Sequence, residues 1–146
     1  MALAMRWLVD GMNVIGSRPD GWWRDRDGAV RRLAGELAGY ARATGEPVAV
    51  VFDGRAVDLA PGVAEGLDAS WAGPGRDAAD GRIAELVEAD AEPATIRVVT
   101  SDRALADRVR AAGAEIVSAG AFRRRLDAPE PGLPPGRVGE GDVEPP

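Results

Sequence analysis

Histidine and cysteine are both absent from this chain of 146 residues. Without cysteine there is no disulfide framework, no thiolate metal site and no thiol nucleophile, as is usual in a reducing compartment. Without histidine there is no imidazole base and no imidazole metal ligand. Lysine is missing too, since all 18 basic residues are arginine, which excludes a Schiff-base lysine. Carboxylates are therefore the acids, bases and metal ligands on which any chemistry must depend.

Long hydrophobic runs are also lacking. The N-terminal sequence MALAMRWLVD reaches Arg6 after only a few apolar residues, which is too short for a signal-peptide core or a membrane span. We therefore expect a cytoplasmic protein with no membrane partner.

The formal net charge of −6 is concentrated near the C-terminus. Residues 127–146 carry five acids and one arginine, and they are rich in proline and glycine. Such a segment has almost nothing with which to build a core, so we predict a disordered acidic tail at 127–146. We predict one domain over residues 1–126, whose own charge is too small to argue for or against a nucleic-acid partner.

Short apolar runs alternate with longer amphipathic ones along this domain. Strands are predicted in RWLVD (6–10), PVAVVFDG (47–54), TIRVVTSD (95–102) and AEIVS (114–118), with a short edge strand in LDASWAG (67–73). Helices are predicted in residues 26–45, 76–92, 101–113 and 119–126, and the segment after the first strand is expected to be an opening loop. This order predicts the α/β class, as a three-layer α/β/α sandwich with a mostly parallel central sheet.

Aspartates stand where the predicted strands end. Asp10 closes the first strand, Asp53 the second, and Asp102 follows the third, while Asp80 lies in the first turn of a helix. Ligands bind at the carboxyl edge of such sheets, where the strand order reverses. Carboxylates crowded there repel one another unless a cation neutralises them, and hard oxygen ligands suit Mg²⁺ or Mn²⁺.

Local capping explains some of these positions equally well. Asp102 would complement the dipole of the helix that it precedes, for which Thr100 or Ser101 is the expected cap. Asp77 is expected to cap its own helix, with Asp80 completing a pair similar to a capping box. The placement of several acids on one edge is nevertheless harder to explain by capping alone.

Four segments, DGMNVIG, VFDG, AADGRIAELV and VVTSDRAL, resemble in this order the NYN domain of PIN-like nucleases, especially its YacP-like bacterial branch. The resemblance covers about residues 6–126. It implies a PIN-like (NYN) fold and a metal-dependent endoribonuclease that uses Mg²⁺ or Mn²⁺. The implied substrate and partner is single-stranded RNA, with messenger RNA and ribosome-associated RNA as candidate sources.

The resemblance also implies roles for individual residues. Asp10, Asp80 and Asp102 match acidic positions of the PIN-like metal site, Asp53 matches an additional acid after the second strand, and Asn13 matches a polar residue of the opening loop. Metal-assisted hydrolysis would use Asp10 and Asp102 as direct ligands and Asp80 as a ligand or a base acting through water. Asp53 is expected either as a weaker ligand or as a residue that contacts the ligands without touching the ion.

Phosphate contacts are expected from polar residues beside these acids. Asn13, Ser17 and Ser101 would hold the scissile phosphate, and Arg76 and Arg82 the neighbouring ones. A capping role is the stronger expectation for Ser101.

Aromatic and basic runs leave two interpretations open. Trp22 and Trp23 would stack on RNA bases in one interpretation. In the other, one of the two is buried against the first long helix. The arginines at 123–125 are either a solvated face or an RNA contact.

Other classes of function fit less well. DGMNVIGSRPDG contains no phosphate-binding glycine pattern of a nucleotide-binding domain. Met12 stands where an aspartyl-phosphate phosphatase would have a second aspartate. The main alternative is a non-catalytic RNA-binding or adaptor protein on the same fold, and a nuclease of DNA or structured RNA is a further one.

Overall fold

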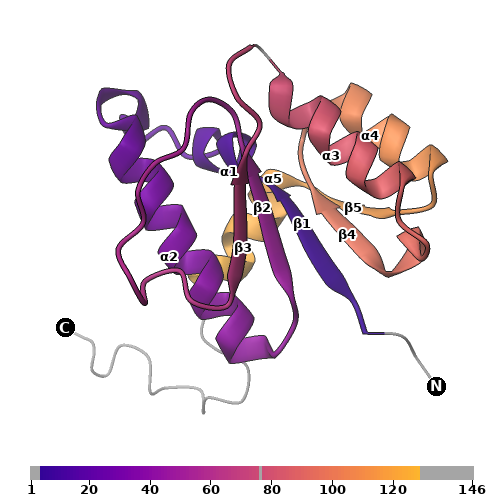
Figure 1. Cartoon of the computed structure of the whole chain (residues 1–146), viewed down its shortest axis with the longest axis horizontal. Coiled ribbons are helices and arrows are strands. Elements are labelled where there is room, and N and C mark those ends of the chain that lie inside the picture. The colour runs from indigo at the N-terminus through magenta and orange to yellow at the C-terminus, as the bar shows by residue number, and fades with distance from the viewer. Residues whose placement is uncertain (1–3, 76, 129–146) are drawn as a thin grey trace.

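The centre of the fold is a five-stranded sheet, whose strands are labelled in Figure 1. The computed structural model describes residues 4–75 and 77–128. The strands are β1 (Arg6–Asp10), β2 (Val48–Phe52), β3 (Leu67–Trp71), β4 (Ile96–Val99) and β5 (Glu115–Val117). They are ordered β3-β2-β1-β4-β5, and each neighbouring pair is parallel. The predicted sheet is confirmed, including its edge strand.

Helices cover both faces of this sheet (Figure 1). One layer contains α1 (Gly11–Gly16), α2 (Arg26–Thr44) and α5 (Ala119–Asp127), and the other contains α3 (Ala78–Glu88) and α4 (Arg103–Ala111). Two short 3₁₀ helices, η1 (Trp22–Arg24) and η2 (Pro93–Thr95), lie in the connections. The predicted three-layer α/β/α sandwich is therefore confirmed.

Strand residues alternate between two hydrophobic clusters. Trp7 and Val9 of β1 pack with α1, α2 and α5, whereas Leu8 between them packs with α3 and α4. Successive strand side chains point to opposite faces, so a strand covered on both sides needs an unbroken apolar run. This requirement explains why the central strands are recognisable in the sequence.

The prediction of a loop after the first strand is wrong, because residues 11–16 form α1 directly after β1. Val14 and Ile15 of this helix are buried, and their packing outweighs the loop-like composition of the segment. Gly11 makes the abrupt start possible, since a Cβ at this position would lie 2.4 Å from ring atoms of Phe52. No side chain larger than hydrogen fits there without moving that ring.

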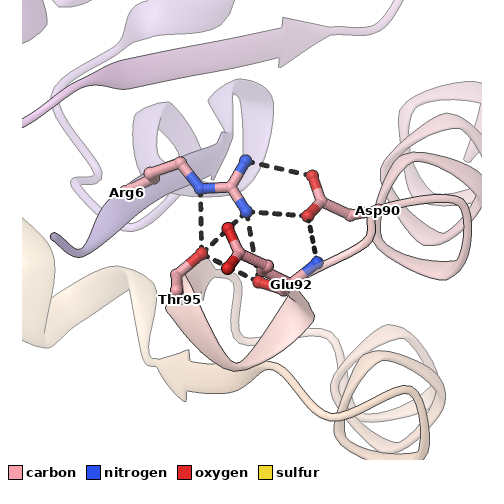
Figure 2. A network of polar contacts seen from close by, with 4 residues as sticks. All are labelled: Arg6, Asp90, Glu92 and Thr95. Carbon is pink, nitrogen blue, oxygen red and sulfur yellow. Dashed lines mark hydrogen bonds and ion pairs between the residues drawn. The ribbon is translucent and has the colours of Figure 1, made fainter. Parts of the chain in front are cut away.

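A polar clamp holds the connection between α3 and β4 against the start of β1 (Figure 2). The Arg6 guanidinium donates to both carboxylate oxygens of Asp90, at 3.0 and 2.8 Å, and its Nε donates to Thr95 Oγ1 at 3.0 Å. Arg6 also donates to the Glu92 carbonyl oxygen at 3.2 Å. The hydrogen bonds from Arg6 lower the pKa of Asp90 to about 2, so the ion pair persists at neutral pH.

The strand order places the candidate site. It reverses between β1 and β4, because the chain moves outward to β2 and β3 on one side and to β4 and β5 on the other. In doubly wound sheets the ligand crevice lies at such a reversal, outside the carboxyl ends of the strands. Asp10 is the last residue of β1 and stands at that point.

The predicted tail, 127–146, lies almost entirely outside the described residues, so the boundary at residue 126 stays a prediction; α5 itself continues to Asp127. Among the described residues, no helix is long and apolar enough to cross a membrane.

Replacing Gly11 by alanine is expected to destabilise the protein by about 1–3 kcal/mol, because the added methyl group overpacks against Phe52. The control is Gly39→Ala in α2, where the nearest neighbour of an added Cβ is Arg42 Nη2, 3.9 Å away. This change should stabilise the helix by roughly 0.5–1 kcal/mol. Chemical denaturation of both variants measures the two effects, and equal shifts would contradict the steric explanation.

Candidate active site

The four predicted acids gather at the carboxyl edge of the sheet from four different elements. They are Asp10 at the end of β1, Asp53 directly after β2, Asp80 in the first turn of α3, and Asp102 at the N-cap of α4. Their charges reach one another, since the charges of Asp80 and Asp53 raise the pKa of Asp10 and that of Asp102 raises the pKa of Asp80. Asp80 and Asp102 also line one hollow of about 140 Å³.

Asp10 is the most buried of these acids, with 4 % of its surface exposed. Burial raises its pKa to about 7, and the charge of Asp80 contributes to the increase. A hydrogen bond from Thr100 Oγ1, 3.1 Å long, acts in the opposite direction by stabilising the carboxylate. A large part of the Asp10 population is therefore protonated at neutral pH when no cation is bound.

Asp80 is half-buried, and its pKa is raised to about 6. Burial is the largest cause, followed by the charges of Asp102 and Asp77. Two neighbouring carboxyl groups thus have pKa values well above the usual range, which is a common property of functional sites.

Asp53 accepts a hydrogen bond from the Ala79 backbone N–H at 2.8 Å and so caps α3 from another element. The prediction of Asp77 as the N-cap of this helix is confirmed for its position but wrong for its hydrogen bond. Asp77 occupies the N-cap position with a φ of 62°, in the left-handed region, and its side chain makes no capping hydrogen bond. A capping side chain normally projects from an extended backbone, which directs its oxygen to the free N–H groups.

Asp102 is itself the cap of α4, because its Oδ1 accepts from the Leu105 N–H at 2.8 Å. The prediction of Thr100 or Ser101 in this role is wrong by one or two positions. Thr100 is instead buried between two acids: its hydroxyl donates to Asp10 and accepts from the Asp102 backbone N–H at 3.1 Å.

Thr100 was not predicted as a site residue. The available signal was its place in VVTSD, since a hydroxyl directly after a buried strand and two residues before an acid lies at the same edge as the acids.

Asn13 and Ser101 join the start of α1 to the segment after β4. Asn13 Oδ1 accepts from the Ser101 N–H at 2.8 Å, and Ser101 Oγ accepts from the Ala119 N–H at 3.0 Å. Ser101 therefore contacts the first backbone N–H of α5, whose N-cap residue is Ser118, and does not cap the helix that follows it. Both residues line a surface hollow of about 330 Å³ together with Ser17, whose hydroxyl donates to the Val14 carbonyl oxygen at 2.6 Å.

Of the two arginines predicted to bind phosphate, the structure describes only Arg82. Arg82 is exposed in α3, two residues from Asp80, and has no ion pair with a described acid. Arg76 lies outside the described residues.

The donor set fits Mg²⁺ or Mn²⁺ only with much of the coordination left to water. Within residues 4–75 and 77–128, no three carboxylates are grouped closely enough to hold an ion by themselves. Mg²⁺ is nevertheless usually bound through one or two carboxylates and keeps several waters. Asp10 and Asp80, whose pKa values are raised first by burial and then by the charges of neighbouring acids, are carboxylates of the kind that such an ion would neutralise.

Metal-free protein should be destabilised by ionised Asp10. An ordinary aspartate has a pKa near 3.8, so unfolding lowers the pKa of Asp10 from about 7. The stability that folding gains from keeping Asp10 protonated is fully present below about pH 4 and is lost as the pH rises through 7. Asp10→Asn should therefore be increasingly more stable than the original protein between pH 4 and pH 8, by at least about 1 kcal/mol at the upper end.

Chemical denaturation in a chelator at several pH values measures this difference. The control is Asp107→Asn, at an exposed acid of α4 that forms only a 3.7 Å ion pair with Arg110. A stability difference for Asp10→Asn that does not change with pH would contradict the assigned pKa.

Comparisons with known proteins agree with this fold. The model of the YacP-like NYN domain matches residues 7–132. A crystal structure of the W164L mutant of Rae1 (YacP) from Bacillus subtilis has 30% sequence identity and a TM-score of 0.69, covering 84% of this chain and 75% of that chain. A second structure of Rae1 (YacP) from Bacillus subtilis has 28% identity and a TM-score of 0.66, with 84% and 73% covered.

A search of curated proteins gives no match. The family match begins at the second residue of β1 and extends past the end of α5, so the positions of the four acids lie within it. The fold is that of PIN-like nucleases, and the chain belongs to the YacP-like NYN domain family.

Proposed function

We propose that this protein is a metal-dependent endoribonuclease that hydrolyses phosphodiester bonds of single-stranded RNA at the edge formed by Asp10, Asp53, Asp80 and Asp102. The observation that carries the proposal is the buried Asp10, whose pKa is raised to about 7 beside a second acid with a raised pKa, at the point where the strand order reverses. A buried carboxylate with other acids beside it is costly for the fold, so a functional reason for it is expected.

Asp10, Asp80 and Asp102 are the proposed ligands of Mg²⁺ or Mn²⁺. A bound divalent ion activates water for attack on phosphorus and neutralises charge on the leaving oxygen. Thr100 orients the Asp10 carboxylate through its hydrogen bond. If Asp80 does not bind the ion directly, it would act as a base through water instead. Asp53 holds the start of α3 and thereby positions Asp80.

The phosphate of the substrate is proposed to lie in the hollow beside the acids. The side-chain amide N–H groups of Asn13 and the hydroxyl proton of Ser101 stay available for donation, because the observed contacts use their oxygens as acceptors. Ser17 lines the same hollow, and exposed Arg82 is placed to contact a neighbouring phosphate. The role proposed for Arg76 rests on its position in the sequence alone.

A non-catalytic RNA-binding protein is the second candidate function. The observation that favours it is the lack of three closely grouped carboxylates among the described residues. Retained RNA binding without any metal-stimulated cleavage would support this candidate against the nuclease.

Asp10→Asn and Asp102→Asn are each expected to lower cleavage of single-stranded RNA in Mg²⁺ or Mn²⁺ by about 100-fold or more, since each removes a ligand charge. The fold should persist, because asparagine caps a helix as well as aspartate does at position 102. Cleavage of an end-labelled RNA, with and without a chelator, measures the effect. Asp107→Asn is the matched control on α4, and cleavage that survives both site changes would refute the site.

Two substitutions of Asp53 separate a ligand from a capping residue. Asp53→Asn keeps an oxygen that can accept from the Ala79 N–H and should retain activity within about 10-fold, whereas Asp53→Ala should lose about 0.5–2 kcal/mol of stability with the cap. Melting curves and cleavage rates of both variants measure the two effects. If Asp53→Asn is as inactive as Asp10→Asn, then Asp53 is a ligand and the assignment as a positioning residue is wrong.

A further inference from the structure

A second hollow lies beyond the acids, in the layer formed by α1, α2 and α5. Its volume is about 60 Å³, and Arg18, Arg32, Arg123 and Trp22 are among the residues that line it. We call it the arginine hollow. Ile15 and Arg18 line the arginine hollow, whereas Gly16 and Ser17 line the hollow of the proposed scissile phosphate. The two hollows therefore share the C-terminal turn of α1 as a common wall.

Three arginines from different parts of the chain converge on the arginine hollow. Arg18 follows α1, Arg32 lies on the exposed face of α2, and Arg123 lies on α5. The lining also contains two acids, Asp20 and Glu36, so within the lining the positive charge exceeds the negative charge by one. Asp127, which is not part of the lining, pairs with Arg18 and Arg123, so Arg32 carries the charge that no described acid pairs. A concave surface of this kind attracts an anion small enough to enter it, such as a phosphate group.

The hydrogen bonds of these arginines leave donors free. Arg123 Nη1 donates to both carboxylate oxygens of Glu36 at 3.0 Å, but its Nε is buried without a hydrogen-bond partner. Arg18 pairs with Asp127 at 2.7 Å, and Arg32 has no ion pair with any described acid. A buried donor without an acceptor is unfavourable, and a phosphate oxygen in the hollow would supply one.

Two tryptophans stand beside these arginines. Trp22 lines the arginine hollow and is half-buried against the core, while Trp23 has 58 % of its surface exposed. The two rings pack edge to face with centroids 6.0 Å apart, and the Arg24 guanidinium lies 5.8 Å from the centre of the Trp23 ring. An exposed indole held in place by a second indole offers a rigid face to a nucleic-acid base, and such stacking is independent of base identity.

We propose that the arginine hollow and Trp23 form a subsite for single-stranded RNA that continues from the acids. A backbone phosphate one or more nucleotides from the scissile bond binds Arg18, Arg32 and Arg123, and a base stacks on Trp23. The inference rests on the proposed function for its substrate, but it concerns residues that have no part in the chemical step. RNA is favoured over an acidic protein partner because phosphate-binding arginines and a stacking indole occur together, on a wall shared with the first hollow.

The proposal is tested by RNA binding in a background that cannot cleave. Asp10→Asn protein is titrated into a fluorescently labelled oligouridylate of about 16 nucleotides, the upper end of the length bound by common single-strand-binding domains. Trp23→Ala should weaken binding by about 5- to 100-fold, the loss of one stacked base. Arg32→Gln should weaken binding and reduce the salt dependence of log K by about 0.7, the release expected for one phosphate contact of a single strand.

Arg42→Gln is the matched control. Arg42 is an exposed arginine of the same helix, about 15 Å from Arg32 along the helix axis. Its substitution should leave RNA affinity and salt dependence unchanged. Neither Trp23 nor Arg32 has a polar side-chain partner among the described residues, so melting curves should show folded variants. Unaltered affinity in both variants would overturn the subsite, and so would an equal loss in Arg42→Gln.

Cleavage by protein with intact Asp10 separates this proposal from the proposed function. Trp23→Ala and Arg32→Gln should raise KM for the same RNA in Mn²⁺, and Arg42→Gln should not. If the original protein binds RNA through these residues but cleaves none, the nuclease is refuted and the subsite is supported. If it cleaves RNA and neither variant changes binding or KM, the subsite is refuted and the nuclease is supported.

Discussion

Burial of a carboxylate among other acids, at one edge of a parallel sheet, is the constraint on which the candidate site depends. Helices cover both faces of the sheet, so the carboxyl ends of the strands form the one edge at which Asp10, Asp53 and Asp102 can meet. Asp10 is buried there, and its pKa is raised to about 7, first by burial and then by the charge of Asp80. Thr100, held between Asp10 and the backbone of Asp102, offsets part of that cost.

Much of the fold could be predicted because the strands are buried on both faces and the helices on one. Runs such as VAVVF in β2 and the helical spacing of Val30, Leu33 and Leu37 in α2 therefore stand out in the sequence. α1 could not be predicted in this way. Gly11, Asn13 and Gly16 are turn-forming residues, and the helix depends on packing against Phe52 and the core that no local pattern reveals.

The gathering of acids could also be predicted, whereas their hydrogen-bond partners could not. Capping was expected between sequence neighbours, yet Asp53 caps a helix that starts 25 residues later, and Ser101 reaches Ala119 in the helix after next. Such partners follow from the distance between elements in the folded chain. Local rules assigned Ser101 to the helix that follows it and gave Asp53 no capping role at all.

α3 is attached to the sheet at both of its ends. Asp53, after β2, binds the backbone of its first turn, and Arg6 of β1 binds Asp90 just beyond its last. An isolated helix of this length has marginal stability in water, and its ends would fray first. With both ends attached, Asp80 can separate from Asp10 only if contacts to the sheet break as well, so the spacing of the two acids is as durable as the central strands themselves.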